Sequence, residues 1–166
     1  MLKKKSLRVP LTSIPPEGLE VDVDLGEQYF SRWREEDPGL EFADARINGT
    51  VRLEKHGRDV LVRGHLRGRL QLTCGRCVES YDAPADADFD LLLVPGPGPA
   101  GGEEELSGPD LDLDYYLGET LDLEAVIREQ IILMVPLKPL CAEDCKGICP
   151  RCGAVLNREY CSCKKD

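Results

Sequence analysis

Six of the eight cysteines in this 166-residue chain lie within its last 26 residues. Cys149 and Cys152 are separated by two residues and followed by Gly153, and a second close pair, Cys161 and Cys163, comes after a short loop. Two cysteines at the first spacing can turn both sulfurs toward one point about 2.3 Å away, and a glycine after them permits a turn with positive φ. The terminal cysteines therefore predict a tetrahedral zinc site.

The other four cysteines form two further close pairs, Cys74 with Cys77 and Cys141 with Cys145. The eight cysteines thus divide into two sets of four, which predicts two structural zinc ions per chain. A disulfide framework needs an oxidising compartment, and the start of the chain has no apolar run of signal-peptide length. We therefore expect a cytoplasmic location, with free or redox-active thiols as the remaining alternative to zinc.

Alternating apolar and polar residues predict a largely β structure. Two long runs, residues 45–54 and 59–73, meet at a His-Gly turn and predict a hairpin, whereas residues 121–134 form the best helix, ended by Pro136. We expect an α+β fold with a mostly antiparallel β sheet or partly open barrel, one long covering helix and a C-terminal zinc-knuckle tail. The remaining expected segments are strands at 7–11, 19–25, 78–95 (a strand pair or one long bent strand) and 110–116, a short helix at 27–36, and a linker at 96–105. The expected domains are the β-rich residues 1–140 with the covering helix, and the cysteine-rich residues 141–166 packed on them.

The second strand of the predicted hairpin has one apolar face and one basic face. Counting in steps of two places Leu66, Leu70 and Leu72 on the apolar face and Arg67 and Arg69 on the other. The basic face is therefore a candidate surface for an anionic partner.

Two charged features near that strand are less regular. Arg63 is expected on the apolar side, where it weakens the pattern or marks a bulge at Gly64. Further along the chain, Asp86, Asp88 and Asp90 alternate on one strand face. No glycine-bearing loop encloses these carboxylates, so a solvated strand face is favoured over a divalent-cation site.

The formal net charge of −10 argues against a protein that coats nucleic acid by bulk electrostatics. The charge is uneven, because residues 46–80 and 132–166 carry a positive balance while residues 81–131 are strongly acidic. If RNA is bound, the positive segments supply the expected contacts; the alternative is that their basic residues solvate a strand face and balance thiolate charge. These RNA-binding candidates are Arg52, Arg67, Arg69, Lys146, Arg151, Arg158, Lys164 and Lys165.

The sequence offers no arrangement typical of an enzyme. It contains no Ser/His/Asp spacing, no phosphate-binding loop and no zinc site with an open coordination position. No stretch is long and apolar enough to span a membrane. We therefore expect a non-enzymatic protein with no small-molecule substrate and no membrane partner.

Three motifs together resemble a known family. They are Cys-Gly-Arg-Cys at residues 74–77, Glu-x-Ile-Ile-Leu-x-x-Pro at 129–136, and the run from 144 to 153 with Leu156, Asn157, Cys161 and Cys163. In these motifs the chain is similar to the bacterial YceD family, whose members are called large ribosomal RNA subunit accumulation proteins.

The resemblance implies a non-enzymatic factor that promotes accumulation of large-subunit ribosomal RNA and ribosome assembly. The implied partner is the large ribosomal subunit precursor or its RNA. The alternative is a zinc-ribbon adaptor that binds a protein partner, such as a basic ribosomal protein.

The resemblance also implies how the cysteines group. Some family members lack the terminal four cysteines as a unit but keep the Cys-x-x-Cys pair. This implies that Cys74, Cys77, Cys141 and Cys145 form site one. Site two then consists of Cys149, Cys152, Cys161 and Cys163.

Overall fold

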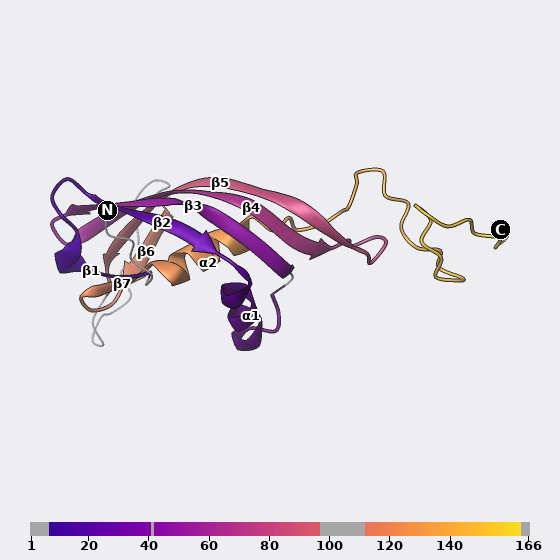
Figure 1. The fold of residues 1–166 in the computed structure, drawn as a ribbon, viewed down its shortest axis with the longest axis horizontal. Helices are drawn as coiled ribbons and strands as arrows, with labels where there is room; N and C mark the ends of the chain where they lie inside the picture. Colours follow the sequence, from indigo (N-terminus) through magenta and orange to yellow (C-terminus); the bar gives the residue numbers. More distant parts are fainter. Residues whose placement is uncertain (1–6, 41, 97–111, 164–166) are drawn as a thin grey trace. The chain divides into compact units, whose positions relative to one another are not determined.

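The structure, a computed structural model, describes residues 7–40, 42–96 and 112–163. Its main feature is a five-stranded sheet in the order β2-β3-β4-β5-β6 (Figure 1). Each strand follows a segment of alternating apolar and polar residues, so that one side chain in two faces the core. The strands are β2 (Leu19–Leu25), β3 (Phe42–His56), β4 (Asp59–Thr73), β5 (Ser80–Pro95) and β6 (Asp112–Tyr116).

The connections make the sheet mostly antiparallel, as predicted. β3 and β4 form the predicted hairpin, and Gly57 has a φ of 66° in the tight turn between them. Residues 78–95 supply one long strand, β5, which pairs in parallel with β6 from Leu91 opposite Asp112 onward. Apart from Gly96, the predicted linker at 96–105 lies outside the described residues. Closure into a partly open barrel stays a prediction.

The chain divides into two compact units. The first consists of residues 1–24, 47–67 and 86–134. It contains a second small sheet, in which β1 (Arg8–Pro10) pairs antiparallel with β7 (Thr120–Asp122), and a short 3-10 helix at Leu11–Ser13.

Helix α2 (Leu123–Leu133) belongs to this first unit and follows β7 directly. The Asp122 carboxylate accepts a hydrogen bond from the backbone N–H of Ala125, which caps the helix start. The helix begins later than predicted because residues 120–122 pair with β1 as a strand. Its buried residues follow the predicted apolar face: Leu123, Val126, Ile127 and Ile131. That α2 covers the sheet stays a prediction.

The second unit consists of residues 25–46, 68–85 and 135–166. It contains α1 (Glu27–Glu36), which confirms the predicted short helix. Phe30 and Trp33 on α1 are buried, and Phe30 packs edge-to-face on Trp33 and Phe42 with ring centroids 5.1 and 5.8 Å away. The described part of the cysteine-rich tail lies in this same unit. The domain boundary expected at residue 140 stays a prediction.

The two faces of β4 differ as expected, with one correction. Leu66, Leu70 and Leu72 are buried, as are Val60 and Val62. The expectation that Arg63 lies on the apolar side was wrong. Steps of two from Leu66 reach Gly64 and then Val62, so Arg63 belongs to the charged face and pairs there with Asp90 at 3.2 Å.

Gly64 provides the space for an aromatic ring on the neighbouring strand. A Cβ atom at position 64 would lie 2.1 Å from Cζ of Phe89 and 2.2 Å from its Cε1. Real carbon contacts are about 3.5–4.0 Å, so any side chain here displaces the ring. Phe89 therefore covers the glycine and fills the volume that a side chain would take.

We expect Gly64→Ala to lower the free energy of unfolding by about 1–3 kcal/mol, because the added methyl overpacks the core face of β4. Urea denaturation measures the loss. The matched control repeats the substitution in a Phe89→Ala background, where the ring is absent and the cost should fall by more than half. Equal costs in the two backgrounds would show that the contact with Phe89 is not the cause.

Candidate metal centre

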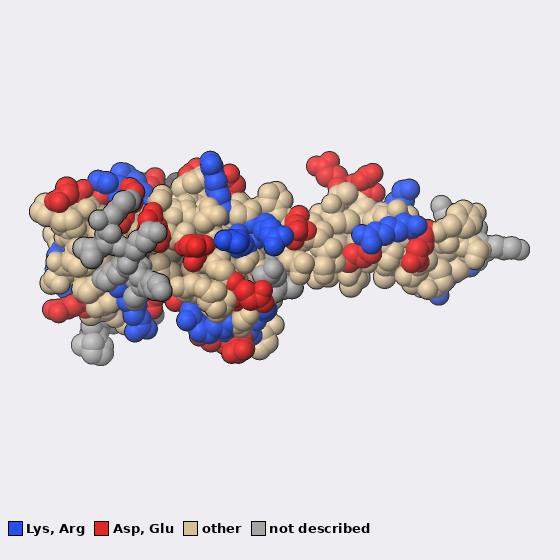
Figure 2. All heavy atoms as spheres, viewed as in Figure 1, with Lys and Arg blue, Asp and Glu red and all other residues tan. Residues whose placement is uncertain are grey.

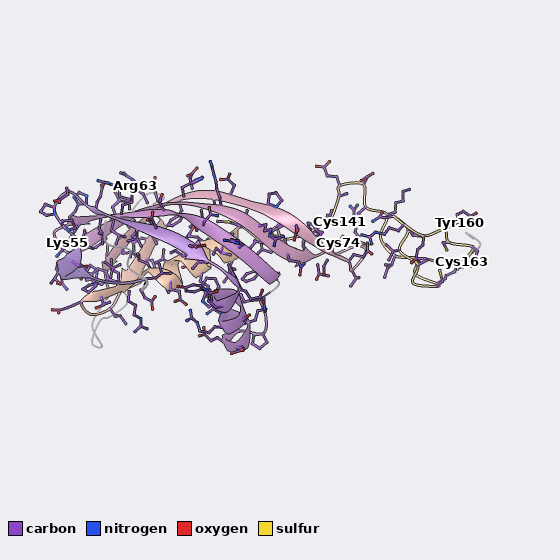
Figure 3. The ribbon with its side chains drawn as sticks, in the orientation of Figure 1. Lys55, Arg63, Cys74, Cys141, Tyr160 and Cys163 are labelled. Atoms are coloured by element: carbon purple, nitrogen blue, oxygen red, sulfur yellow. The ribbon has the colours of Figure 1, made fainter. Side chains whose placement is uncertain are left out.

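The structure brings the eight cysteines together in two sets of four. In each set all Sγ atoms lie within 4.8 Å of one another. Figure 3 labels Cys74 and Cys141, which come from distant parts of the chain and meet in the same set. Site one contains Cys74, Cys77, Cys141 and Cys145, and site two contains Cys149, Cys152, Cys161 and Cys163. Within the part of the chain that the structure describes, these are the groups suited to hold a metal ion.

The sulfur separations fit a tetrahedral metal site. Four sulfurs about 2.3 Å from a central zinc ion are about 3.8 Å apart along each tetrahedral edge. In site one the Cys74–Cys145 distance is 3.8 Å and the Cys77–Cys141 distance 3.7 Å. In site two Cys152–Cys161 is 3.7 Å. A disulfide would bring two sulfurs to about 2.05 Å, so these thiols are spaced for a shared ion.

The two Cys-x-x-Cys turns have the same backbone arrangement. The N–H of Val78 donates to the carbonyl of Cys74 at 2.9 Å, and the N–H of Gly153 donates to the carbonyl of Cys149 at 2.9 Å. The residue after each second cysteine has a positive φ, 59° at Val78 and 74° at Gly153. The glycine signalled this turn in the sequence, whereas a valine gives no such signal. Val78 is 65% exposed, so its side chain meets no crowding there.

Site one joins the end of β4 to the segment after α2. The N–H of Gly75 donates to the carbonyl of Pro139 at 2.7 Å. The Arg76 guanidinium donates to the carbonyls of Glu143, at 2.9 Å, and Cys145, at 3.1 Å. Arg76 therefore ties the two cysteine pairs together through backbone oxygens. Sequence reasoning missed it, because an arginine between two cysteines gives no sign of which carbonyls it will reach.

Asn157 is a second residue that the pattern of cysteines did not identify. Its side-chain N–H donates to Cys145 Sγ at 3.1 Å, and its Oδ1 accepts from the backbone N–H of Lys146 at 2.8 Å. Such outer hydrogen bonds hold a thiolate ligand in position and spread its charge.

Hydrogen bonding decides which thiols ionise first. Burial opposes ionisation of Cys74, but N–H groups of Cys77, Cys141 and Arg76 outweigh it and lower the pKa of this thiol to about 6. The N–H groups of Cys152 and Arg151 likewise lower the pKa of Cys149 to about 6. Each Cys-x-x-Cys turn therefore begins with a thiolate, which is the form that binds a metal.

The remaining thiols respond to these first charges. A hydrogen bond with Cys145 raises the pKa of Cys141 to about 12. Hydrogen bonds with Cys161 and Cys152 raise the pKa of Cys163 to about 12. Four thiolates placed this close repel one another unless a cation lies between them.

The two sites differ in burial. Cys74, Cys77 and Cys145 of site one are buried, and Tyr81, Leu140 and Val155 pack against them. In site two Cys149 is buried but Cys152 is exposed. A metal in site one is therefore better shielded from water and chelators than one in site two.

The arginines proposed to contact RNA are ion-paired. Arg67 lies 3.3 Å from Asp86 and Arg69 lies 3.1 Å from Asp82 across the β4–β5 pair. With Arg63–Asp90 they form a cross-strand series that we call the β4–β5 ladder, defined by Arg63, His65, Arg67 and Arg69 with Asp82, Asp86, Asp88 and Asp90. The three aspartates expected on a solvated face are thus partners of the basic face.

The other RNA-binding candidates vary in their surroundings. Arg52 pairs with Glu54 at 2.8 Å and donates to the carbonyl of Glu17, and Arg158 pairs with Glu79 at 3.1 Å. Lys146 and Arg151 are exposed. Lys164 and Lys165 lie outside the described residues. Figure 2 shows blue and red side chains interspersed on the face in view, without a broad basic surface.

No helix among the described residues combines the length and the apolar character needed to cross a bilayer.

Comparison with known proteins identifies relatives of this chain. An uncharacterized protein of Mycobacterium tuberculosis is 29% identical over 115 residues, which is 69% of this chain and 54% of that protein. Two chloroplastic proteins named large ribosomal RNA subunit accumulation protein YCED homolog 1 also match. The Arabidopsis thaliana protein is 28% identical over 61–62% of the pair's shorter member, and the Zea mays protein is 31% identical, covering 61% of this chain and 43% of the relative.

The chain spans about half the length of the curated relatives it matches first, at 54%. No solved structure matches it. Residues 62–166, which include all eight cysteines, match the family described as Large ribosomal RNA subunit accumulation protein YceD. Since this match covers more than half of the chain, the protein belongs to the YceD family.

Proposed function

We propose that this chain is a non-enzymatic factor that promotes the accumulation of large-subunit ribosomal RNA and the assembly of the ribosome. The observation that carries the proposal is the family match over residues 62–166, together with the names of the Arabidopsis and maize relatives. The proposed partner is a large-subunit precursor or its RNA. We also propose a cytoplasmic location, supported by thiols that are spaced for a metal rather than bonded in pairs.

We further propose that each cysteine set holds one structural zinc ion. Four sulfur ligands complete the preferred coordination of zinc and leave no position for a substrate or an activated water. This closed ligand set supports a structural role rather than an enzymatic one. Each zinc with four thiolates carries a net charge of −2, so two filled sites make the molecule more acidic.

A second candidate function is an adaptor that binds a protein, for example a basic ribosomal protein. The β4–β5 ladder favours it, because each arginine there has an aspartate within ion-pairing distance. A phosphate approaching Arg67 or Arg69 would also meet those carboxylates. Such exposed pairs are worth only about 0–1 kcal/mol each, so a strongly bound RNA could still replace them.

Sedimentation of cell extracts tests the proposed function. We expect the tagged full-length chain to sediment with large-subunit precursor particles, and crosslinking should then separate contacts to RNA from contacts to protein. Absence from such particles would contradict the proposal. Crosslinks to protein alone would favour the adaptor.

Two matched double variants test the ladder as an RNA contact. If it binds RNA, Arg67→Gln/Arg69→Gln should weaken association and flatten its salt dependence by roughly 0.7–0.9 in log–log slope per lost phosphate contact. Asp82→Asn/Asp86→Asn should instead strengthen association, since it removes the competing carboxylates. Unchanged association in both variants would leave these arginines a structural role only.

A further inference from the structure

The loop of site two is folded back on the segment that precedes it. Cys149 donates its N–H to the carbonyl of Ala154, and Leu156 donates to the carbonyl of Gly147, both at 2.9 Å. Ile148 and Val155 form an isolated antiparallel bridge between these two bonds. The result is a short two-stranded turn whose ends are the ligands of site two.

The same loop completes the surroundings of site one. Asn157 lies between Cys152 and Cys161 in the sequence, yet its side chain bonds to Cys145 Sγ at 3.1 Å and lies 4.0 Å from Cys141 Sγ. Val155 packs against the buried cysteines of site one. The loop of one site therefore supplies the polar and apolar neighbours of the other.

Holding Asn157 in place depends on how the loop is closed. Its side chain must satisfy the N–H of Lys146 and a site-one sulfur at once, which fixes both its position and its rotamer. A metal shared by Cys152 and Cys161, which are nine positions apart, fixes the ends of the loop that carries it. Without that metal, the loop must be ordered at the expense of chain entropy when site one fills.

We infer that metal binding at site two strengthens metal binding at site one, and that Asn157 is the positioning residue through which the two sites are coupled. The inference rests on the proposed zinc sites. Coupling of this kind is reciprocal, so a metal in site one must strengthen binding at site two by the same factor. Outer hydrogen bonds to metal ligands are typically worth about 10–100-fold in metal affinity, which sets the expected size.

The test measures zinc affinity of site one in the full chain, by competition with a chromophoric chelator. Cys152→Ser/Cys163→Ser removes site two, and Asn157→Ala removes the connecting side chain. Each variant should weaken zinc binding at site one by about 10–100-fold. Their combination should weaken it no further than the larger single effect, because both act through the same contact.

Arg158→Gln is the matched control on the same loop. Arg158 forms an ion pair with Glu79, but its side chain is 72% exposed, so its loss should change zinc affinity at most a few-fold. The reciprocal measurement is made on Cys74→Ser, which should bind zinc at site two more weakly by the same factor as found for site one.

The outcomes separate the inference from the proposed function. Two zinc ions bound with unchanged affinity in all variants would overturn the coupling and leave the two structural sites in place. Effects that simply multiply in the combined variant would remove Asn157 as the connection. A wild-type chain that binds no zinc would overturn the zinc sites and the coupling together.

Discussion

Replacing Cys74 with serine is expected to reduce the zinc content from two equivalents to one and to lower the free energy of unfolding by about 4 kcal/mol. Site one links Cys77 to Cys141, which are 64 positions apart. A cross-link that closes a loop of this length restricts the unfolded chain by about 4 kcal/mol. Metal analysis gives the stoichiometry, and denaturation in excess zinc gives the stability.

Cys152→Ser is the matched control for this prediction. It should also leave one equivalent of zinc at saturation, but the loop between Cys152 and Cys161 is only nine positions long. Closing it is worth about 2.5 kcal/mol, so this variant should unfold less easily than Cys74→Ser. A single equivalent that survives Cys74→Ser and disappears in Cys152→Ser would show that site one holds no metal.

Substituting Gly147 by alanine is expected to destabilise the second unit by about 2–4 kcal/mol. Gly147 has a φ of 72°, and a Cβ atom there would lie 3.0 Å from the carbonyl oxygen of Arg76. The strained backbone costs about 1–3 kcal/mol, and the contact with backbone adds to it because Arg76 is held by its own hydrogen bonds. Denaturation and zinc competition at site one should both report the loss.

Gly153→Ala separates the two causes. Its φ of 74° is nearly that of Gly147, but a Cβ atom there would meet nothing within 4 Å. We expect this variant to lose only the backbone contribution, about 1 kcal/mol. If the two alanine variants were equally destabilised, the approach of residues 147 and 76 would have no energetic importance.

Local patterns predicted the elements of this fold well, since strand and helix periodicity depend on neighbouring residues. Alternation identified β2 and the β3–β4 hairpin, and the break at Pro136 placed the end of α2 to within a few residues. The parallel β5–β6 pair could not be predicted, because nothing local sets the direction in which a distant strand returns. β7 was taken for helix because three residues are too few to show a period.

The metal centre was predictable only as far as cysteine spacing reaches. Spacing and family resemblance grouped the ligands that the structure brings together. The outer contacts were not predictable, because Arg76 and Asn157 act on residues that are near only after folding. The partners of Arg67 and Arg69 were missed for the same reason. A basic strand face and an acidic strand were each visible, but their alignment depends on strand register.

The separation of the site-one ligands also affects when the chain can finish folding. Cys74 and Cys77 leave the ribosome well before Cys141 and Cys145 are synthesised, and contacts between such distant residues form slowly. The first pair must therefore wait, with its thiols open to oxidation or to the wrong metal, until the second pair emerges. Zinc supply during synthesis thus controls the yield of correctly folded chains as well as their final stability.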